Sequence, residues 1–206
     1  MHEAGRKMRE FLERHGYYRG RDLGDIYRSA KDEEPLRFDG FFDPPASGID
    51  RETGQGVPYV TYGFATHMTE VEVDEATGAC RVKRVHASHD VGKAINPSLV
   101  RGQVCGGVAM GIGFALMEDF IPGETASLDG YYLPTSMDMP EIQVLVVEDP
   151  EPSGPFGAKG VGEPALIPQA ASIVNGIRDA VGVKVSRLPC DPERLKILLE
   201  RRKEKR

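Results

Sequence analysis

A glycine-rich loop that ends in an acidic residue is the segment of this sequence best suited to chemistry. Gly154, Gly157, Gly160 and Gly162 can bring main-chain N–H groups close to a bound anion or heterocycle. Glu163 follows just before an expected helix, where the helix N-terminus favours the carboxylate form and burial would favour the neutral acid. Opposed in this way, the two effects could poise a general base, although an ordinary acidic residue at a helix start is the simpler interpretation of the pattern.

A second unusual segment is apolar and rich in glycine, and it runs from Gly102 to Gly113. Each glycine inside a helix costs about 1 kcal/mol relative to alanine, so we expect close packing of a neighbouring backbone to compensate for most of them. Gln103 is a polar amide in this otherwise apolar run. Its donor and acceptor would fit an amide-like ligand, and a hydrogen-bonded structural amide is an equally good interpretation.

Other polar residues give weaker signals. His86 and His89, with Asp90 beside them, do not find a third and fourth ligand at a spacing suited to zinc, so we expect no protein-bound metal here. Lys159 either pairs with a phosphate or is an exposed loop lysine, and the sequence does not separate the two.

Composition excludes several classes of protein. The net charge of -6 and the pI near 5.5 argue against a sequence-independent nucleic-acid binder. The longest apolar run, Val104 to Met117, is shorter than the ~20 residues of a membrane span, and the charged residues 1–14 lack the apolar core of a signal peptide. The three cysteines contain no C-x-x-C pair, which favours a reducing cytoplasm and excludes an iron–sulfur cluster held by this chain alone.

Helical and strand patterns alternate irregularly along the chain. Apolar periodicity and caps predict helices at Met8–His15, Asp22 to about Lys31, Pro97 to about Glu118, Pro168 to Gly182, and from Asp191 onward. Alternation predicts strands within Tyr59–Asp74, Arg81–His86 and Glu141–Val147, the first two joined as a hairpin by Ala76-Thr77-Gly78. Loops are expected at 89–97 and 149–162, and a basic, solvated helix end at Arg201–Arg206. This mixture favours an α+β fold.

Four segments, in this order and spacing, resemble the last part of the large subunit of xanthine dehydrogenases, aldehyde oxidoreductases and related molybdenum hydroxylases. They are Tyr59-Val60-Thr61-Tyr62-Gly63-Phe64 before Glu70–Asp74, His89-Asp90-Val91-Gly92-Lys93-Ala94-Ile95-Asn96-Pro97, Gly102-Gln103-Val104-x-Gly106-Gly107, and Gly157-Ala158-Lys159-Gly160-Val161-Gly162-Glu163-Pro164. Tyr132–Thr135 before Met139–Ile142 fits the same family pattern. The resemblance implies a helical lead-in at residues 1–35 and the C-terminal part of a molybdopterin-binding domain at residues 36–206.

The resemblance also implies a cofactor and a division of roles. The family holds molybdenum through a molybdopterin, often as the cytosine dinucleotide, with no protein atom as a metal ligand. Glu163 would be the base that activates the water-derived oxygen, which attacks an aldehyde or an N-heteroaromatic carbon. Gln103, with Gly102, would contact the pterin, and the metal site would be lined by Ala158, Lys159, Gly160, Val161 and Gly162.

Large subunits of this family are several times longer than 206 residues, and their upstream pterin-binding segments and substrate-positioning residues have no counterpart here. We therefore expect a cofactor shared with another molybdopterin-binding chain, with iron–sulfur clusters and FAD on further subunits. Either the large subunit is split between two chains or this chain is a truncated piece of it. An inactive remnant and a non-catalytic assembly module are the alternatives to a catalytic role.

Overall fold

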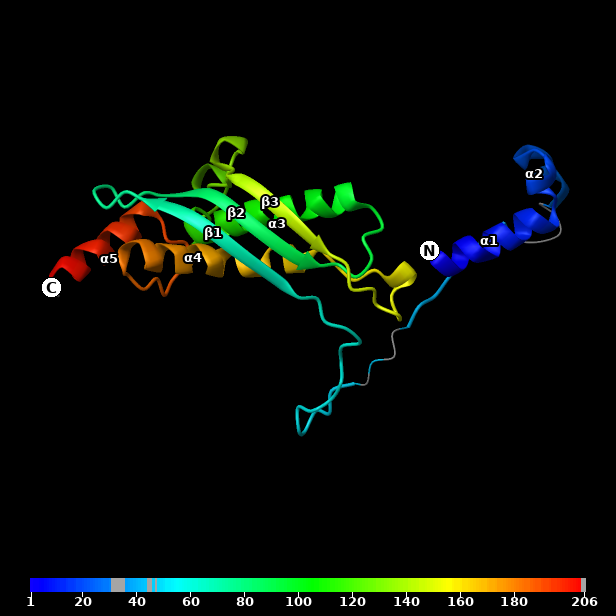
Figure 1. The fold of residues 1–206 in the computed structure, drawn as a ribbon, viewed down its shortest axis with the longest axis horizontal. Helices are drawn as coiled ribbons and strands as arrows, with labels where there is room; N and C mark the ends of the chain where they lie inside the picture. The colour runs from blue at the N-terminus through cyan, green and yellow to red at the C-terminus, as the bar shows by residue number, and fades with distance from the viewer. Residues whose placement is uncertain (31–35, 44–45, 47, 205–206) are drawn as a thin grey trace. The chain divides into compact units, whose positions relative to one another are not determined.

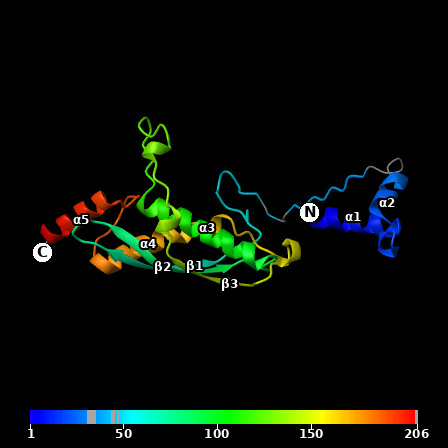
Figure 2. The same ribbon diagram turned by 90° about the horizontal axis from the view of Figure 1, so that it is seen from above.

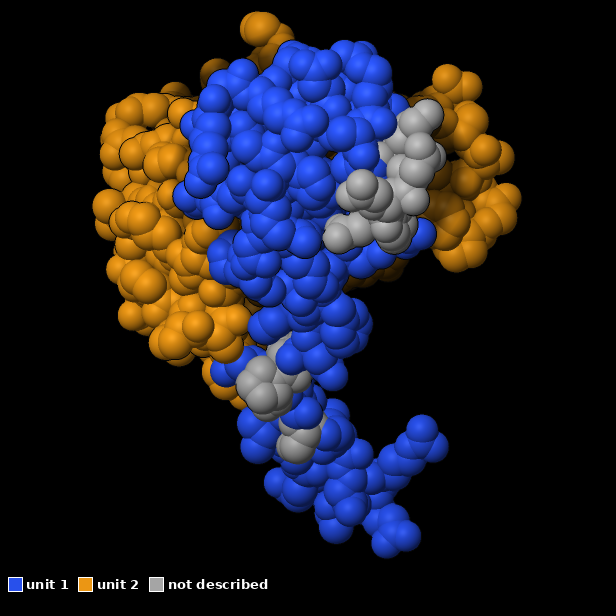
Figure 3. All heavy atoms as spheres, turned by 90° about the vertical axis from the view of Figure 1, so that its right-hand side faces the viewer, with its two compact units in different colours: residues 1–60 blue, residues 61–206 orange. Residues whose placement is uncertain are grey.

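The structure, a computed structural model, describes residues 1–30, 36–43, 46 and 48–204, and it divides into two compact units. Unit 1 is Met1–Val60 and unit 2 is Thr61–Arg206, coloured separately in Figure 3. The expected segment boundary at residues 35 and 36 falls inside unit 1. Residues 31–35, as well as Lys205 and Arg206 of the expected basic tail, lie outside the described residues.

The described residues of unit 1 form two helices and a short connecting turn. Helix α1 (His2–Arg14) begins six residues before the predicted Met8, because ion pairs one turn apart such as Arg6–Glu10 support a first half without apolar periodicity. A 3-10 turn, η1 (Tyr17–Arg19), leads to α2 (Leu23–Ala30), and the predicted end at Lys31 lies outside the described residues. A small core is formed by Phe11, Ile26 and Ala30, with Leu12, Leu36 and Phe38 against it.

Unit 2 is built on a three-stranded sheet in the order β1-β2-β3 (Figure 1). The predicted hairpin is confirmed: β1 (Ala65–Val73) pairs antiparallel with β2 (Cys80–Asp90), with a bulge between Glu70 and Val71. Strand β3 (Glu141–Val147) has the predicted bounds and pairs in parallel with β2. The structure differs at two ends, because β1 begins after Phe64 and β2 continues through His89 and Asp90, which the sequence assigned to a loop.

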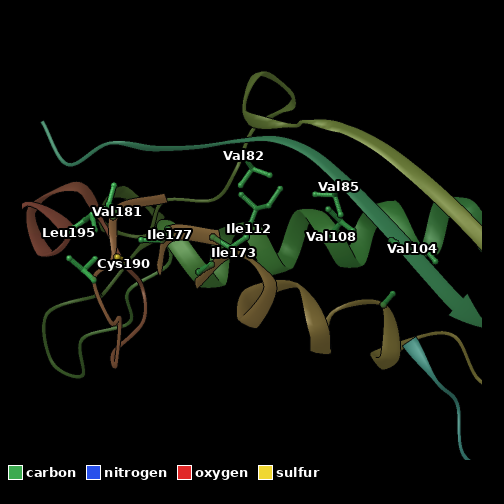
Figure 4. Close-up of a cluster of buried hydrophobic side chains, with 14 of the residues drawn as sticks. Val82, Val85, Val104, Val108, Ile112, Ile173, Ile177, Val181, Cys190 and Leu195 are labelled. Atoms are coloured by element: carbon green, nitrogen blue, oxygen red, sulfur yellow. The ribbon is translucent and has the colours of Figure 1, made fainter. Parts of the chain in front are cut away.

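One face of the sheet is covered by two helices, α3 (Pro97–Leu116) and α4 (Ile167–Val181) (Figures 1 and 2). Val82, Val85, Ala87 and His89 of β2 are buried on this face, with the step from Val82 to Val85 at the bulge, and Figure 4 shows Val82 and Val85 meeting Val108 and Ile112 of α3. The side of the sheet opposite the helices is largely exposed. These helices and the mixed sheet confirm the predicted α+β class.

Glycines let the two helices approach closely, as the sequence led us to expect. A Cβ atom at Gly107 would lie 2.5 Å from the backbone carbon of Ala165, and one at Gly111 would lie 2.5 Å from the Cβ of Gln169. Gly102 and Gly106 lie on the exposed side of α3, where no described atom comes within 4 Å of an added Cβ. Only part of the glycine run is therefore explained by packing.

The last helix, α5 (Pro192–Glu204), holds the tip of the β1–β2 hairpin. Lys196 Nζ donates to the carbonyl oxygens of Glu75 and Ala76, at 3.2 and 2.8 Å, and Arg202 pairs with the Glu75 carboxylate. The predicted cap is present, with Asp191 Oδ1 accepting from the Arg194 amide at 2.8 Å.

Helix α3 is long and apolar enough, by length and composition, to cross a membrane. Its buried residues include Val104, Val108 and Ile112, which contribute to the core of unit 2. A core helix passes the same test of length and composition, so this feature does not itself indicate a membrane. Between α3 and α4 the chain forms short 3-10 helices at η2 (Leu128–Gly130), η3 (Ser136–Asp138), η4 (Pro155–Gly157) and η5 (Glu163–Ala165).

Candidate functional site

Glu163 begins the short helix η5, directly before α4. Its carbonyl accepts from the Leu166 amide at 2.9 Å, and its side chain is exposed. The prediction of an acidic residue at a helix start is therefore confirmed. The burial expected around the carboxylate is not supplied by the described residues.

The loop before Glu163 is attached to the end of β2. Lys93 N donates to Gly157 O at 2.7 Å and Lys159 N donates to Val91 O at 2.9 Å, so that Gly92 and Ala158 form an antiparallel bridge. In Figures 1 and 2 the segment after β3 returns alongside this strand end. Two of the segments that the sequence singled out, residues 89–97 and 157–164, are thus brought together.

Lys159 is neither an exposed loop lysine nor a free cation for a phosphate. Its Nζ lies 2.6 Å from Asp90 Oδ2, and the two side chains are only 7% and 8% exposed. The hydrogen bond that Lys159 Nζ donates to the Asp90 carboxylate raises the pKa of Lys159. Burial alone would raise the pKa of Asp90, but the contacts from Lys159 and the Gly92 amide outweigh burial and lower it. Any contact of Lys159 with a ligand would therefore come through its backbone.

Gln103 and Gly102 lie on the exposed face of α3. Gln103 stands one helical turn, about 6 Å along the axis, before Gly107, which touches Ala165 two residues after Glu163. Gln103 and the Glu163 loop are therefore at the same end of the α3–α4 pair. Val161, which the resemblance places at the lining of the metal site, is half-buried and packs on the core.

Glycines of the 157–163 loop and of the exposed face of α3 leave open space above their backbone. Gly160 and Gly162, like Gly102 and Gly106, have no described atom within 4 Å of the place where a Cβ would stand. Gln103, at the same end of the α3–α4 pair, is also exposed. Space above glycine backbone, an amide with a donor and an acceptor, and a nearby carboxylate are the features that a molybdopterin would need, so the residues present fit that cofactor.

Behind this surface lies a buried polar network that the sequence did not reveal. Gln169 of α4, fully buried, contacts His67 Nδ1 through Oε1 at 2.7 Å and donates through Nε2 to Thr69 Oγ1 at 3.2 Å. His67 Nε2 lies 2.7 Å from His89 Nε2, and His89 is 1% exposed. Ser172 Oγ lies 2.8 Å from Thr69 Oγ1.

Both histidines of the network are shifted toward their neutral forms. Burial lowers the pKa of His89 to about 4, and the nearby His67 adds to the effect. Burial also lowers the pKa of His67, while the contact with Gln169 opposes this shift. His86 and His89 lie on opposite faces of β2, so they do not form a pair. A metal bridging His67 and His89 does not fit either, because nitrogens on one tetrahedral zinc stand about 3.3 Å apart for bonds of ~2.0 Å.

Comparison with known proteins gives consistent matches. Residues 2–140 match the family model described as the molybdopterin cofactor-binding domain. The chain is 41% identical over 152 residues to the aldehyde oxidoreductase of Megalodesulfovibrio gigas, a match covering 73% of this chain and 17% of that protein. It is 35% identical over 185 residues to the xanthine dehydrogenase molybdenum-binding subunit of Escherichia coli O157:H7, covering 84% of this chain and 25% of that protein.

The fold agrees with these matches. The structure is similar to that of the aldehyde oxidoreductase from Desulfovibrio gigas, with a TM-score of 0.77 and 38% identity over 85% of this chain and 20% of that one. The chain thus spans a quarter or less of the length of these relatives. The family model ends before the Glu163 loop, whereas a match over 84% of the chain is long enough that it has to include this loop.

Proposed function

Because the chain belongs to the family of molybdopterin cofactor-binding domains found in aldehyde oxidoreductases and xanthine dehydrogenases, we propose that it supplies one wall of a molybdenum hydroxylase active site and the base of the reaction. The observation that carries the proposal is the exposed Glu163 carboxylate at the end of a loop with open space over Gly160 and Gly162, at the same end of the α3–α4 pair as the exposed Gln103. The cofactor, when bound, supplies the redox chemistry of hydroxylation, in which a substrate carbon gains a water-derived oxygen and gives up two electrons.

The residues of this chain have separate tasks in the proposed site. Gln103 hydrogen-bonds the edge of the pterin through its amide, and Gly102 leaves room for the ring system. The backbone from Ala158 to Gly162 approaches the metal end of the cofactor without providing a ligand to it. A carboxylate oxygen of Glu163 accepts the proton that the water-derived oxygen loses as it attacks the substrate. The substrate is an aldehyde or an N-heteroaromatic compound.

In the proposed complex, another polypeptide chain supplies the remaining walls of the active site. Glu163 and Gln103 are exposed on this chain, whereas proton transfer to a base proceeds best where water is excluded. Large apolar side chains share the exposed face of α3 with Gln103, namely Leu99, Met110 and Phe114. Exposed apolar patches of this kind mark interaction surfaces. We propose that a second molybdopterin-binding chain covers them, with iron–sulfur clusters and FAD on further subunits, and the three free cysteines favour a cytoplasmic complex.

Isolation of the native complex tests this function. We expect the chain to co-purify with molybdenum in stoichiometric amount and with a larger molybdopterin-binding partner. A chain that purifies alone and without molybdenum would favour an inactive remnant, and one that binds the partner without molybdenum would favour an assembly module.

The role of Glu163 is tested separately in the loaded complex. Glu163→Gln keeps the shape of the side chain but removes the base, so turnover should fall by about 10²- to 10⁴-fold while molybdenum content stays unchanged. Glu124→Gln, at an exposed position between α3 and β3, is the matched control and should retain full turnover. Undiminished turnover of Glu163→Gln would reject the assigned role.

A further inference from the structure

The segment that carries Glu163 is fixed at both of its ends. At the first end, Lys159 is held by its backbone bond to Val91 and by its buried ion pair with Asp90. Asp90 Oδ1 accepts from the Gly92 amide at 3.0 Å. This local hydrogen bond orients the carboxylate so that its second oxygen, Oδ2, faces Lys159. This end of the segment cannot shift without breaking a desolvated charge pair.

At the second end, the chain beyond Glu163 enters α4 under the glycines of α3. Ala165 lies against Gly107, and Gln169 lies against Gly111. Gln169 then contacts His67, which contacts His89, at 2.7 Å in each case. The start of α4 is therefore connected to β2 through a chain of two hydrogen bonds.

Both connections end on consecutive residues of one strand. His89 faces the helices and Asp90 faces the opposite way, because side chains alternate along β2. We propose that the His89-Asp90 dipeptide positions Glu163 by anchoring both ends of the segment Gly157–Gln169, with Asp90 acting through Lys159 and His89 acting through His67 and Gln169. Neither residue touches the reacting atoms, so both are positioning residues, and the proposal rests on the proposed function of Glu163.

The histidine link has a defined direction. Gln169 Nε2 donates to Thr69 and its Oε1 can only accept, so His67 Nδ1 carries a proton. In the neutral ring His67 Nε2 then accepts, and His89 Nε2 donates to it. This leaves His89 Nδ1 as an unprotonated, buried nitrogen without a hydrogen-bond partner among the described residues. If both rings were protonated, two N–H groups would face each other and this contact would be lost, and burial disfavours the charged form of each ring.

Nitrogen NMR of the full chain labelled in histidine tests this link directly. Long-range ¹⁵N–¹H spectra distinguish the two tautomers of a neutral imidazole from the imidazolium. At pH 7 we expect a protonated Nδ1 on His67 and a protonated Nε2 on His89. The reverse tautomers, or an imidazolium at either residue, would overturn the proposed link.

Hydrogen exchange tests the two anchors, the Asp90–Lys159 ion pair and the His89–His67–Gln169 link, independently. Asp90→Asn keeps the bond to Gly92 but removes the charge pair, and it should raise exchange at the amides of Lys93 and Lys159 by at least about tenfold. His89→Phe should raise exchange at the amides of Leu166 and Gln169 instead. Faster exchange throughout β1 and β2 in either variant would mean general loss of stability and would overturn the proposal, as would unchanged exchange at these amides.

Matched variants separate positioning from folding. His86→Phe alters the same strand on its other face and should leave both sets of amides unchanged. Gln169→Glu keeps an acceptor for His67 and should preserve exchange protection at Leu166, whereas Gln169→Leu should lose it. This rescue by a conservative variant is not expected if Gln169 merely fills space.

Turnover of the loaded complex connects the anchors to Glu163. Asp90→Asn and His89→Phe should each lower kcat by about tenfold or more, with KM within twofold and molybdenum content unchanged, because a misplaced base affects the chemical step. If Glu163→Gln keeps full turnover, the proposed function fails, and the exchange data still decide the anchoring. If Glu163→Gln loses turnover but the anchor variants do not, the positioning proposal alone is overturned.

Discussion

Replacing Gly102 with alanine should separate stability from cofactor binding. Gly102 lies inside α3, and an added Cβ meets no described atom within 4 Å. Alanine is therefore favoured over glycine by about 0.5–1 kcal/mol in the free chain, through helix propensity. For a domain of this size, 1 kcal/mol corresponds to a rise in Tm of roughly 2–4 °C.

In the proposed complex the same Cβ would stand where the pterin lies. Gly102→Ala should therefore reduce the molybdenum content of the assembled complex while it raises the Tm of the free chain. Few substitutions on a protein surface are expected to move these two quantities in opposite directions, which makes the result specific.

Gly107→Ala is the matched control in the same helix. Its Cβ would lie 2.5 Å from the backbone and from the Cβ of Ala165, so the two helices would have to separate. Overpacking of this kind costs about 1–3 kcal/mol, which outweighs the gain in helix propensity. We expect a net loss of about 1–2 kcal/mol.

Thermal unfolding followed by circular dichroism measures the first quantity, and metal analysis of the purified complex measures the second. Open space at Gly102 is refuted if Gly102→Ala fails to raise Tm, and close packing at Gly107 is refuted if Gly107→Ala does not lower it. A stabilised Gly102→Ala chain that still binds a full complement of molybdenum would instead refute the placement of the cofactor over this face.

Three further outcomes follow from the structure. Gly92 has a φ of +63°, and a Cβ there would lie 2.7 Å from Lys159 N, so Gly92→Ala should lose at least about 1–2 kcal/mol in urea unfolding. The pKa of His89 is lowered to about 4, so its contribution to the free energy of unfolding is complete above pH 6.5 and is lost as the pH falls toward 4. His89→Phe should therefore reduce the pH dependence of the free energy of unfolding in this range by up to about 3 kcal/mol. Burial raises the pKa of Cys80 to about 12 and of Cys190 to about 11, so a thiol reagent at pH 8 should modify both at least about tenfold more slowly than in the unfolded chain.

Local signals predicted most of the secondary structure. Alternation in Glu141–Val147 and along the first strand of the hairpin, and the helical stripe that ends at Gly182, are read within windows of up to about fifteen residues. Glycine at 182 adopts a φ of +67°, as expected for a helix stop. The predicted start of α1 was wrong because the first half of this helix has no apolar periodicity. Ion pairs one turn apart stabilise it instead.

The parallel pairing of β2 with β3 and the polar network could not be predicted in this way. Gln169 and His67 are 102 positions apart, and their contact depends on how α4 crosses the sheet. A signal does exist, since His67 and Thr69 occupy inward positions of β1 in register with Val71 and Val73. Polar residues at inward positions of two elements indicate that they meet, but one sequence does not identify the partner of each.

The docking of α5 on the hairpin tip has a consequence for the order in which the chain folds. Lys196 and Glu75 are 121 positions apart, so a ribosome completes the hairpin well before it makes the residues that hold its tip. The β1–β2 pair can form from local contacts alone, whereas closure of this long loop is slow. During synthesis the tip of the hairpin therefore stays exposed to solvent until α5 has been made and has docked on it.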